Sequence, residues 1–425
     1  MLIEFRISNY KSIREEQVFS LVASSDKKNC IENVLDRDLP GMKGLQFLKG
    51  AALYGANASG KSTLVQGLQF MSHYVASCAV GMKPDSPTGR KPFKLDNFSS
   101  SEPTAFEVTF VAEEVRYQYG FSLNDTEILE EYLIAYPKGS AQKWFQRGGE
   151  GVKEWPTSSY FKGHVGLQEK TRKNALFLSV GAVWNHPQLT PVYEWFTGQL
   201  RFLGLSYEHL LTPNFTLERI AKSEKYKHWV WKLMQSADLG LRGVVREDLV
   251  TPVAQFKENH PEMADQIPDG AEEIKEIRSL LFEHKVGDGK FFIEHEEESA
   301  GTRRFFAMVG FWLHILANGY TVFVDEIDTS LHPILVREIL KMLFSNKYNP
   351  KGAQVVFTTH NPTMLDHNLI RRDQVWFTEK DQEGATHLYP LIDYSPRQGE
   401  ALAKGYLAGR YGAIPFIEGG LRFED

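Results

Sequence analysis

The chemistry of this 425-residue chain is concentrated first in one glycine-rich segment, Gly55-Ala-Asn-Ala-Ser-Gly-Lys-Ser62. It lies between a short apolar run and a stretch with helical spacing, the context that a phosphate-binding loop requires. Glycines let backbone N–H groups converge on phosphate oxygens at a helix N-terminus. The lysine then reaches the β- and γ-phosphates, and the serine hydroxyl joins a Mg²⁺ shell. A chance glycine-rich turn would not match both the context and every fixed position. The predicted nucleotide-binding residues are Gly55, Asn57, Gly60, Lys61, Ser62 and Thr63.

Two adjacent carboxylates follow an apolar run at Thr321–Glu326 (TVFVDE). Placed past a strand end, one acid can enter the Mg²⁺ shell and the next can stand beside an attacking water. We therefore assign Asp325, with Ser62, to the metal, and Glu326 as the base that orients and deprotonates the water. Apolar runs that end in acids are common, so this pattern gains its meaning from the phosphate-binding loop.

Two further residues could act on the same phosphates. His360 follows the predicted strand Gln354–Thr358, where a histidine can donate a hydrogen bond to a γ-phosphate, and its position one helix after the acids favours this role. Asp328 lies two residues after Glu326. A simple helix cap is the alternative for Asp328, with Ser330 as a competing cap.

A helix start precedes the acids, in Glu297-Glu-Ser-Ala-Gly-Thr-Arg-Arg304. Ser299 has the character of an N-cap, and the free N–H groups around Gly301 would form an anion site at the start of the apolar helix Phe305–Leu316. Taken alone, the pattern indicates only a capped helix.

The surrounding elements alternate in a way that favours a mainly parallel sheet with helices on both faces. Alternation also predicts antiparallel strands in the first third of the chain, and residues 81–101, rich in Pro, Gly, Ser and Lys, are predicted to be a mobile connection. The predicted strands are Ile3–Ile7, Gly50–Tyr54, Phe106–Phe110, Val115–Phe121, Glu130–Tyr136, Phe291–Glu297, Thr321–Val324 and Gln354–Thr358, and the predicted helices are Ser62–Ala76, Lys225–Met234, Glu272–Phe282 and those beginning at Thr302 and Pro333.

Composition excludes several classes of protein. With 42% hydrophobic residues the chain can build a large core, and a net charge of −6 excludes a chain-wide polycation. Cys30 and Cys78 form no CxxC pair, so neither a disulfide framework nor a cysteine zinc site is favoured. Glu4 and Arg6 interrupt any signal peptide, and polar residues interrupt the apolar stretch Phe305–Val324. A cytoplasmic protein without a membrane segment is expected.

Taken in order, GANASGKS, ESAGTRR, TVFVDE, the aspartate of EIDTSLHP, and TTH resemble the ATPase heads of the ABC class, in the branch shared by SMC, RecF and OLD-type proteins. The resemblance implies ATP and Mg²⁺ as cofactors, with hydrolysis carried out by Glu326 and His360. It also implies that Ser299 and Gly301 close over the ATP of a second protomer, with Asp328 in the loop between protomers. Ala300 departs from the transporter signature, as do Thr302 and Arg303.

The resemblance covers about residues 1–75 and 290–380 with specific motifs. It implies an α/β fold: an ABC-type ATPase head with a mixed, mainly parallel sheet, an antiparallel β subdomain and a helical insertion. The expected ATPase domain combines residues 1–160 and 285–425, with antiparallel strands at about 100–140, and the expected helical insertion spans 161–284. Compact ATPases of bacterial phage-defence operons, of the RloA, PARIS AriA and Septu PtuA kind, are similar in the PFKL segment, the FEVTF strand and the tail Gly405–Pro415.

That similarity implies an ATP-hydrolysing sensor or regulator in anti-phage defence. The implied partners are a second copy of the chain, or a larger homo-oligomer, and a separately encoded effector, typically a nuclease. A nucleic acid or a phage protein would be the trigger. The alternative is a DNA-binding ATPase of the RecF or SMC kind, with basic clusters at 170–173 and at Lys222, Lys225 and Lys227 as its contacts. The tail is either a loop that folds back on the sheet or a contact surface for a partner.

Overall fold

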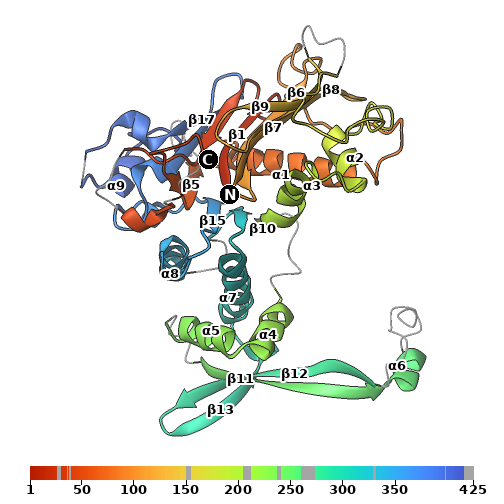
Figure 1. Cartoon of the computed structure of the whole chain (residues 1–425). Helices are drawn as coiled ribbons and strands as arrows, with labels where there is room; N and C mark the ends of the chain where they lie inside the picture. The colour runs from red at the N-terminus through yellow and green to blue at the C-terminus, as the bar shows by residue number, and fades with distance from the viewer. Residues whose placement is uncertain are drawn as a thin grey trace, which may run out of the picture. The chain divides into compact units, whose positions relative to one another are not determined.

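The computed structural model describes residues 1–25, 30–35, 37, 40–149, 155–203, 212–236, 241–259, 273–328, 332–397 and 399–415. The chain forms two compact units, shown in Figure 1 and described separately below. The larger unit combines Met1–Glu208 with His314–Asp425, and the smaller unit is His209–Leu313. The boundaries therefore lie at 208/209 and 313/314, whereas the sequence analysis expected an insertion over 161–284.

A six-stranded sheet in the larger unit carries the predicted phosphate-binding loop. Its strand order is β10-β14-β15-β5-β16-β17, and all neighbours are parallel except β16 and β17. Its strands are β10 (Leu200–Leu203), β14 (Thr321–Val324), β15 (Gln354–Thr358), β5 (Gly50–Gly55), β16 (Val375–Lys380) and β17 (Thr386–Pro390). Every residue of β5, β14 and β15 is buried, which explains why these strands have continuous apolar sequences.

A second six-stranded sheet in the same unit is wholly antiparallel, in the order β2-β1-β6-β7-β8-β9. Its strands are β1 (Leu2–Ser8), β2 (Gln17–Ser20), β6 (Thr104–Ala112), β7 (Val115–Leu123), β8 (Ile128–Tyr136) and β9 (Gln142–Gly148). Alternation of buried and partly exposed residues along β6 and β8 produces the predicted pattern. The predicted mixed α/β fold class, with a mainly parallel sheet and an antiparallel part, is confirmed.

The helix that follows the phosphate-binding loop, α1 (Lys61–Ser77), contacts strands of both sheets. Leu64, Leu68 and Met71 of α1 belong to one core cluster with Leu53 of β5 and Phe106 of β6. A Cβ at Gly67 would lie 2.2 Å from the side chain of Ile7 in β1, so this helix packs against the antiparallel sheet at the closest approach a glycine permits.

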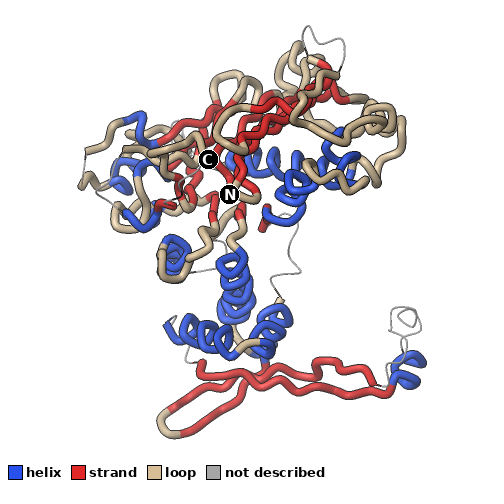
Figure 2. Tube along the Cα trace, viewed as in Figure 1, coloured by secondary structure: helices blue, strands red, loops and turns tan. Residues whose placement is uncertain are grey.

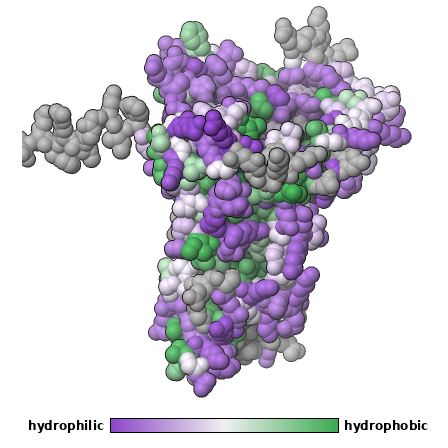
Figure 3. All heavy atoms as spheres, turned by 90° about the vertical axis from the view of Figure 1, so that its left-hand side faces the viewer, coloured by the Kyte–Doolittle hydropathy of each residue, from purple (hydrophilic) through white to green (hydrophobic). Residues whose placement is uncertain are grey.

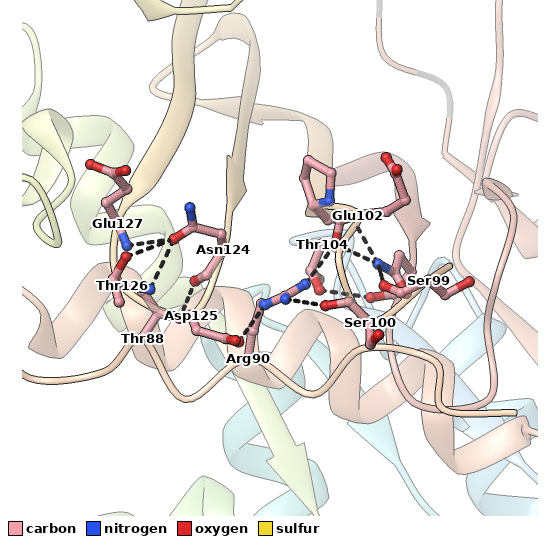
Figure 4. A network of polar contacts seen from close by, with 12 residues as sticks. Thr88, Arg90, Ser99, Ser100, Glu102, Thr104, Asn124, Asp125, Thr126 and Glu127 are labelled. Carbon is pink, nitrogen blue, oxygen red and sulfur yellow. Dashed lines mark hydrogen bonds and ion pairs between the residues drawn. The ribbon is translucent and has the colours of Figure 1, made fainter. Parts of the chain in front are cut away.

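The segment expected to be a mobile connection is fixed by hydrogen bonds (Figure 4). Arg90 pairs with Asp125 at 2.6 Å, and its guanidinium donates to the carbonyls of Ser100 and Glu102, both at 2.6 Å. Thr88 donates from its hydroxyl to the carbonyl of Asn124 at 2.5 Å. The Arg90 side chain is only 3% exposed. The prediction of a mobile linker was wrong because Thr88 and Arg90 bind backbone carbonyls and so hold the segment in place.

The smaller unit contains a three-stranded antiparallel sheet as well as helices (Figure 2). Its elements are α4 (Pro213–Lys222), α5 (Glu224–Ser236), β11 (Leu241–Pro252), α6 (Val253–Asn259), β12 (Glu273–Val286), β13 (Gly289–Glu294) and the first part of α7 (Ala300–Asn318). The helix predicted at Lys225–Met234 is present as α5. The helix predicted at Glu272–Phe282 was wrong, because this segment pairs with β11 as strand β12. The strand predicted at Phe291–Glu297 is present in part as β13, which ends at Glu294 before the 3-10 turn His295–Glu297 and belongs to this sheet, not to the parallel one.

The C-terminal tail folds back on the parallel sheet. Tyr406 of α9 (Leu402–Leu407) and Tyr411 each stack on Phe377 of β16, with ring centroids 5.8 and 5.9 Å apart. Both tyrosines are buried. The sequence left open whether the tail folds back on the sheet or forms a contact surface for a partner. Tyr406 and Tyr411 fold back on the sheet.

The remaining elements are short helices, turns and strands, apart from the 12-residue helix α8. They are β3 (Val34–Leu35), β4 (Phe47–Leu48), α2 (Phe177–Val183), α3 (Thr190–Glu194), the π-helix η2 (Trp195–Gln199), α8 (Pro333–Phe344) and the 3-10 turns Ile31–Asn33, His295–Glu297, Pro362–Met364, Arg372–Gln374 and Leu391–Tyr394. On the face drawn in Figure 3, hydrophilic residues predominate and apolar ones form small separate patches. No helix within the described part of the chain has the length and apolar character needed to cross a membrane.

Candidate nucleotide-binding site

The glycine-rich loop connects the end of β5 to the start of α1, as the sequence predicts. Gly60 is the N-cap of α1 and has φ 110°, a backbone conformation that favours glycine. A Cβ at Gly60 would also lie 2.3 Å from the Thr386 hydroxyl oxygen of β17. Two independent constraints, backbone conformation and close packing, therefore require glycine at this position.

The loop is held in place by polar contacts with its own lysine and with neighbouring strands. The Lys61 ammonium donates to the carbonyls of Gly55 at 2.8 Å and Ala56 at 2.9 Å. The Ser59 hydroxyl contacts the Thr378 hydroxyl of β16 at 2.6 Å, and the Thr386 hydroxyl donates to the Ser59 carbonyl at 2.9 Å. The loop is thus preorganised around a concave backbone, with a cation beside it.

Asp325, the first residue after β14, meets the loop directly. Its Oδ1 accepts a hydrogen bond from the Ser62 hydroxyl at 3.0 Å and another from the Thr358 hydroxyl at 2.7 Å. Ser62 and Asp325, 263 positions apart in the chain, are therefore in contact. These are the two residues that the sequence analysis assigned to a metal ion.

Glu326 follows in a left-handed backbone conformation, with φ 53°. Its residue surface is exposed, unlike that of the half-buried Asp325. Because successive residues past the strand end take different backbone conformations, the two adjacent acids have different environments. Burial lowers the pKa of the Lys61 ammonium, while the nearby carboxylates of Asp325, Glu326 and Asp328 raise it in opposition. All three acids therefore lie close enough to the loop lysine to raise its pKa against the effect of burial.

Asp328 and His360 lie at the same strand ends. Asp328 Oδ2 accepts a hydrogen bond from the Thr359 hydroxyl at 2.8 Å, and its buried Oδ1 has no hydrogen-bond partner among the residues that the structure describes. His360 comes directly after Thr359 and is exposed. Helix α8 is capped by His332, whose ring accepts from the Ile334 N–H at 3.4 Å, so the alternative in which Asp328 caps this helix does not hold. Ser330, the competing cap, lies outside the described residues.

Ser299 and Gly301 belong to the smaller unit. The Thr302 N–H donates to the Ser299 hydroxyl at 3.1 Å, so Ser299 caps α7 as predicted. Ser299, Ala300 and Gly301 are all exposed at this helix start. The larger unit by itself thus brings together Lys61, Ser62, Asp325, Glu326 and Asp328 at one sheet edge, while the two predicted signature residues lie in the other unit.

Several hydroxyl residues of the site were missed in the sequence analysis. Thr358 and Thr359 bind the acids, Thr378 and Thr386 bind the loop, and Ser12 lies between Thr63 at 3.0 Å and Thr386 at 2.8 Å. The pair of threonines directly before His360 is a signal that could have been used, because two hydroxyls at a strand end are well placed to bind carboxylates. Thr378 and Thr386 gave no comparable signal.

The donor set of this edge fits a magnesium-bound nucleotide. Mg²⁺ prefers oxygen ligands and is bound through one or two protein oxygens together with phosphates and waters. Within the described residues, no group of three or more His, Cys, Asp or Glu side chains is arranged to hold a metal by itself. A serine hydroxyl and one carboxylate beside a phosphate-binding loop supply the small number of protein ligands that such a cation needs.

The family described as "AAA domain, putative AbiEii toxin, Type IV TA system" matches residues 51–180 and 185–366, more than half of the chain. The chain belongs to this family of AAA ATPases. The match includes the whole loop, both acids and His360. No curated protein matches the chain.

Solved structures of SMC heads are similar to this chain over most of its length. An SMC head domain from Thermotoga maritima has 12% sequence identity and a TM-score of 0.39, covering 92% of this chain and 98% of the other. An Smc head domain with an extended coiled coil, bound to the C-terminal domain of ScpA and derived from Pyrococcus furiosus, has 13% identity and a TM-score of 0.38, covering 93% and 97%.

Proposed function

We propose that the protein binds ATP with Mg²⁺ at the loop edge of the parallel sheet and hydrolyses it. The observation that carries this proposal is the convergence of Lys61, Ser62 and Asp325, with the Ser62 hydroxyl 3.0 Å from the Asp325 carboxylate. Membership of an AAA ATPase family supports it. Bound Mg²⁺ supplies charge neutralisation for the phosphate oxygens during phosphoryl transfer.

In this proposal, different residues of the chain bind the phosphates, hold the cation and accept the proton. The N–H groups of the loop and the Lys61 ammonium bind phosphate oxygens. Ser62 and Asp325 hold the cation. Glu326, exposed beyond the strand end, accepts the proton of the attacking water, and His360 donates a hydrogen bond to the terminal phosphate.

The proposed biological role is that of a cytoplasmic regulator in bacterial anti-phage defence. ATP would join two or more copies of the chain, with Ser299 and Gly301 of one copy facing the nucleotide of the other. The exposure of Ser299 and Gly301 at the start of α7 supports this use. A separately encoded effector, proposed to be a nuclease, would be the second partner, with a nucleic acid or a phage protein as the trigger. The family's description as part of a toxin–antitoxin system supports a function in a two-component system.

DNA binding of the RecF or SMC kind gains less support from the predicted basic clusters. Arg172 donates to the carbonyls of Cys78 and Ala79, and the Lys170 ammonium lies 4.1 Å from the Trp184 ring centroid. Lys222 and Lys227 pair with Glu218 and Glu224. Arg172 and Lys170 are thus engaged within the chain, and Lys222 and Lys227 each lie beside a surface acid that reduces the local positive charge, so the regulator remains the preferred proposal.

The test is to measure ATP turnover of the unaltered chain beside Glu326→Gln, together with the mass of Glu326→Gln by light scattering with and without ATP and Mg²⁺. Removing a general base should lower turnover by about 100-fold or more. Glu338→Gln is the matched control, because Glu338 is a surface acid on α8 that pairs with Lys341. We expect the mass of Glu326→Gln to double only when ATP is present.

Turnover by Glu326→Gln equal to that of the unaltered chain would contradict the assignment of the base. A large assembly that is the same with and without ATP would contradict ATP-driven association and point to a preformed scaffold. Absence of turnover in the unaltered chain, in a sample that binds ATP, would limit the proposal to nucleotide binding.

A further inference from the structure

Two consecutive threonines, Thr358 and Thr359, lie at the end of β15 with both side chains fully buried. We infer that Thr358 is a positioning residue for hydrolysis, whose single hydroxyl fixes the orientation of the Asp325 carboxylate and the backbone of Glu326. Thr359 fixes Asp328 and the segment after His360 in the same way. The inference rests on the proposed ATPase function and adds two residues to it.

The Thr358 hydroxyl uses its donor and its acceptor on neighbouring residues of the acid loop. It donates to Asp325 Oδ1 at 2.7 Å and accepts from the Glu326 N–H, also at 2.7 Å. The main chain adds a third connection, because the Ile327 N–H donates to the Thr358 carbonyl at 3.1 Å. A valine of the same shape could make the main-chain contact but neither hydroxyl contact.

The conformation of Glu326 explains why such a contact is needed. A left-handed backbone is unfavourable for a non-glycine residue, and φ at Glu326 is 53°. The N–H groups of Glu326 and Ile327 both donate to Thr358, so this one residue fixes the two peptide planes that flank Glu326 in this conformation. Where strain occurs at a candidate site, the surrounding contacts must maintain it. Thr358 provides such a contact for the residue proposed to orient the water.

Asp325 has two hydroxyl donors, Ser62 and Thr358, and only one of them is proposed to bind a cation. A serine oxygen that binds a metal is less available to orient the carboxylate beside it. Thr358 lies on the strand side of Asp325 and belongs to a fully buried strand. It is therefore the donor that can keep the carboxylate oriented, as outer partners of metal ligands generally do.

Thr359 makes an analogous pair of contacts on the other side of the strand end. Its hydroxyl donates to Asp328 Oδ2 at 2.8 Å and accepts from the Asn361 N–H at 3.0 Å. Asn361 follows His360, so this hydroxyl links Asp328 to the residues that flank the histidine. The neighbouring hydroxyls thus have separate targets, which makes their effects separable by experiment.

The experiment compares Thr358→Val, Thr358→Ser, Thr359→Val and Thr321→Val in the full chain. Thr321 is the matched control: it is a buried threonine on β14, and its hydroxyl donates to Gln354 at 3.1 Å at the opposite end of the β14–β15 pair. Steady-state ATPase rates are measured across a Mg²⁺ titration. Binding of a fluorescent ATP analogue is measured across the same titration, and melting temperature monitors folding.

We expect Thr358→Val to lower kcat by about 10- to 100-fold and to raise the Mg²⁺ concentration for half-maximal binding several-fold, as loss of an outer partner of a metal ligand does. Thr358→Ser keeps the hydroxyl and should stay within about threefold of the unaltered chain. Thr359→Val should lower kcat without changing the Mg²⁺ requirement. Thr321→Val should change neither quantity.

Thr358→Val with unaltered kcat and Mg²⁺ dependence would overturn the inference, and so would a Thr321→Val defect equal to that of Thr358→Val. If Thr358→Val does not fold, Thr358→Ser decides, because it keeps the hydroxyl. A folded Thr358→Ser variant whose kcat falls by about 10- to 100-fold would contradict a role for the hydroxyl. Failure of the proposed hydrolysis is seen separately, as absence of turnover in the unaltered chain. In that case the Mg²⁺ dependence of analogue binding still tests Thr358.

Discussion

The two six-stranded sheets of the larger unit hold their carboxylates in opposite ways. In the antiparallel sheet, Glu131 of β8 is fully buried and accepts from the Tyr119 hydroxyl at 2.9 Å and from the N–H groups of Phe177 and Leu178 at 2.7 and 3.0 Å. Arg147 lies 3.8 Å away. In the parallel sheet, Asp325 and Asp328 lie at strand ends, where they are half-buried and accept from hydroxyl groups.

This difference indicates which carboxylates are available to bind a ligand. Both oxygens of Glu131 are used within the protein, although burial raises its pKa against the effect of Arg147 and the hydrogen bonds. Asp328 has one oxygen without a hydrogen-bond partner in the described part of the chain, and Asp325 lies beside the loop. A carboxylate with all its hydrogen bonds made inside the core stabilises the fold, whereas one with spare capacity at a strand end can bind a ligand.

Among variants that test this difference between the sheets, Lys61→Ala should have the largest effect, on ATP affinity. Because the loop lysine is the fixed cation of the proposed site, its loss should weaken ATP binding by about 100-fold or more, as removal of a charge-assisted contact to phosphate with several kcal/mol of interaction does. Titration with a fluorescent ATP analogue measures this. Binding within a few-fold of the unaltered chain would mean that the loop is not the nucleotide site.

A fold defect without a binding defect is expected from Glu131→Ala. Removing one member of a buried, hydrogen-bonded pair costs about 3–5 kcal/mol, because Arg147 and two helix N–H groups lose their acceptor. Denaturant unfolding measures the loss, and Glu131→Gln, which keeps an acceptor oxygen, should lose less. ATP affinity per folded molecule should not change. A variant that is stable but has lost ATP binding would break the proposed division between the sheets.

Lys49, the buried residue directly before β5, should make the stability of the fold moderately dependent on pH. Its ammonium donates to the Phe344 carbonyl and to Asn346, both at 2.6 Å, and burial lowers its pKa to about 8 from 10.5. Between these values the unfolded chain holds the proton and the folded chain does not, so stability rises with pH. The rise is at most about 1.4 kcal/mol per pH unit.

The measurement is the melting temperature of the unaltered chain and of Lys49→Met at pH values from 7.5 to about 9.5, within the range where lysine titration matters. The difference between the two proteins should shift in favour of the unaltered chain as pH rises. A difference that does not depend on pH would mean that Lys49 stays charged in the fold through its two acceptors.

The smallest expected effect is a difference in reactivity between the two thiols, which leaves the stability of the fold unchanged. Cys78 is fully buried after α1, and burial raises its pKa to about 11, while Cys30 is only half-buried. At about pH 8, near the ordinary thiol pKa, a thiol reagent should label Cys30 alone, and Cys78 only after denaturation. Mass spectrometry of labelled peptides measures this. Rapid labelling of Cys78 would show that the core between the sheets opens.

The parts of the site that were predicted are those encoded by local order. The loop, α1, the apolar strands and the acids at their ends each have a short sequence pattern, and all were found. The segment Glu272–Phe282 has a helical spacing of apolar and charged residues, but pairing with β11, more than 20 residues earlier, determines its structure as a strand. Short strands such as β10 and β16, and the hydroxyls of Thr378 and Thr386, depend on neighbours that no local pattern reveals.

The order of strands in the parallel sheet also has a consequence for biosynthesis. All six strands of the antiparallel sheet lie before residue 149, so that sheet can assemble from the first third of a nascent chain. β5 lies in that same third, yet its two neighbours are β15 and β16, which end at Thr358 and Lys380. The strand that carries the loop therefore has no strand partner until about 300 further residues have been synthesised, which takes roughly 15 to 60 seconds at typical rates of synthesis. A nascent chain could complete the proposed nucleotide site only after β16 has been synthesised, and until then the unpaired β5 segment is available to chaperones.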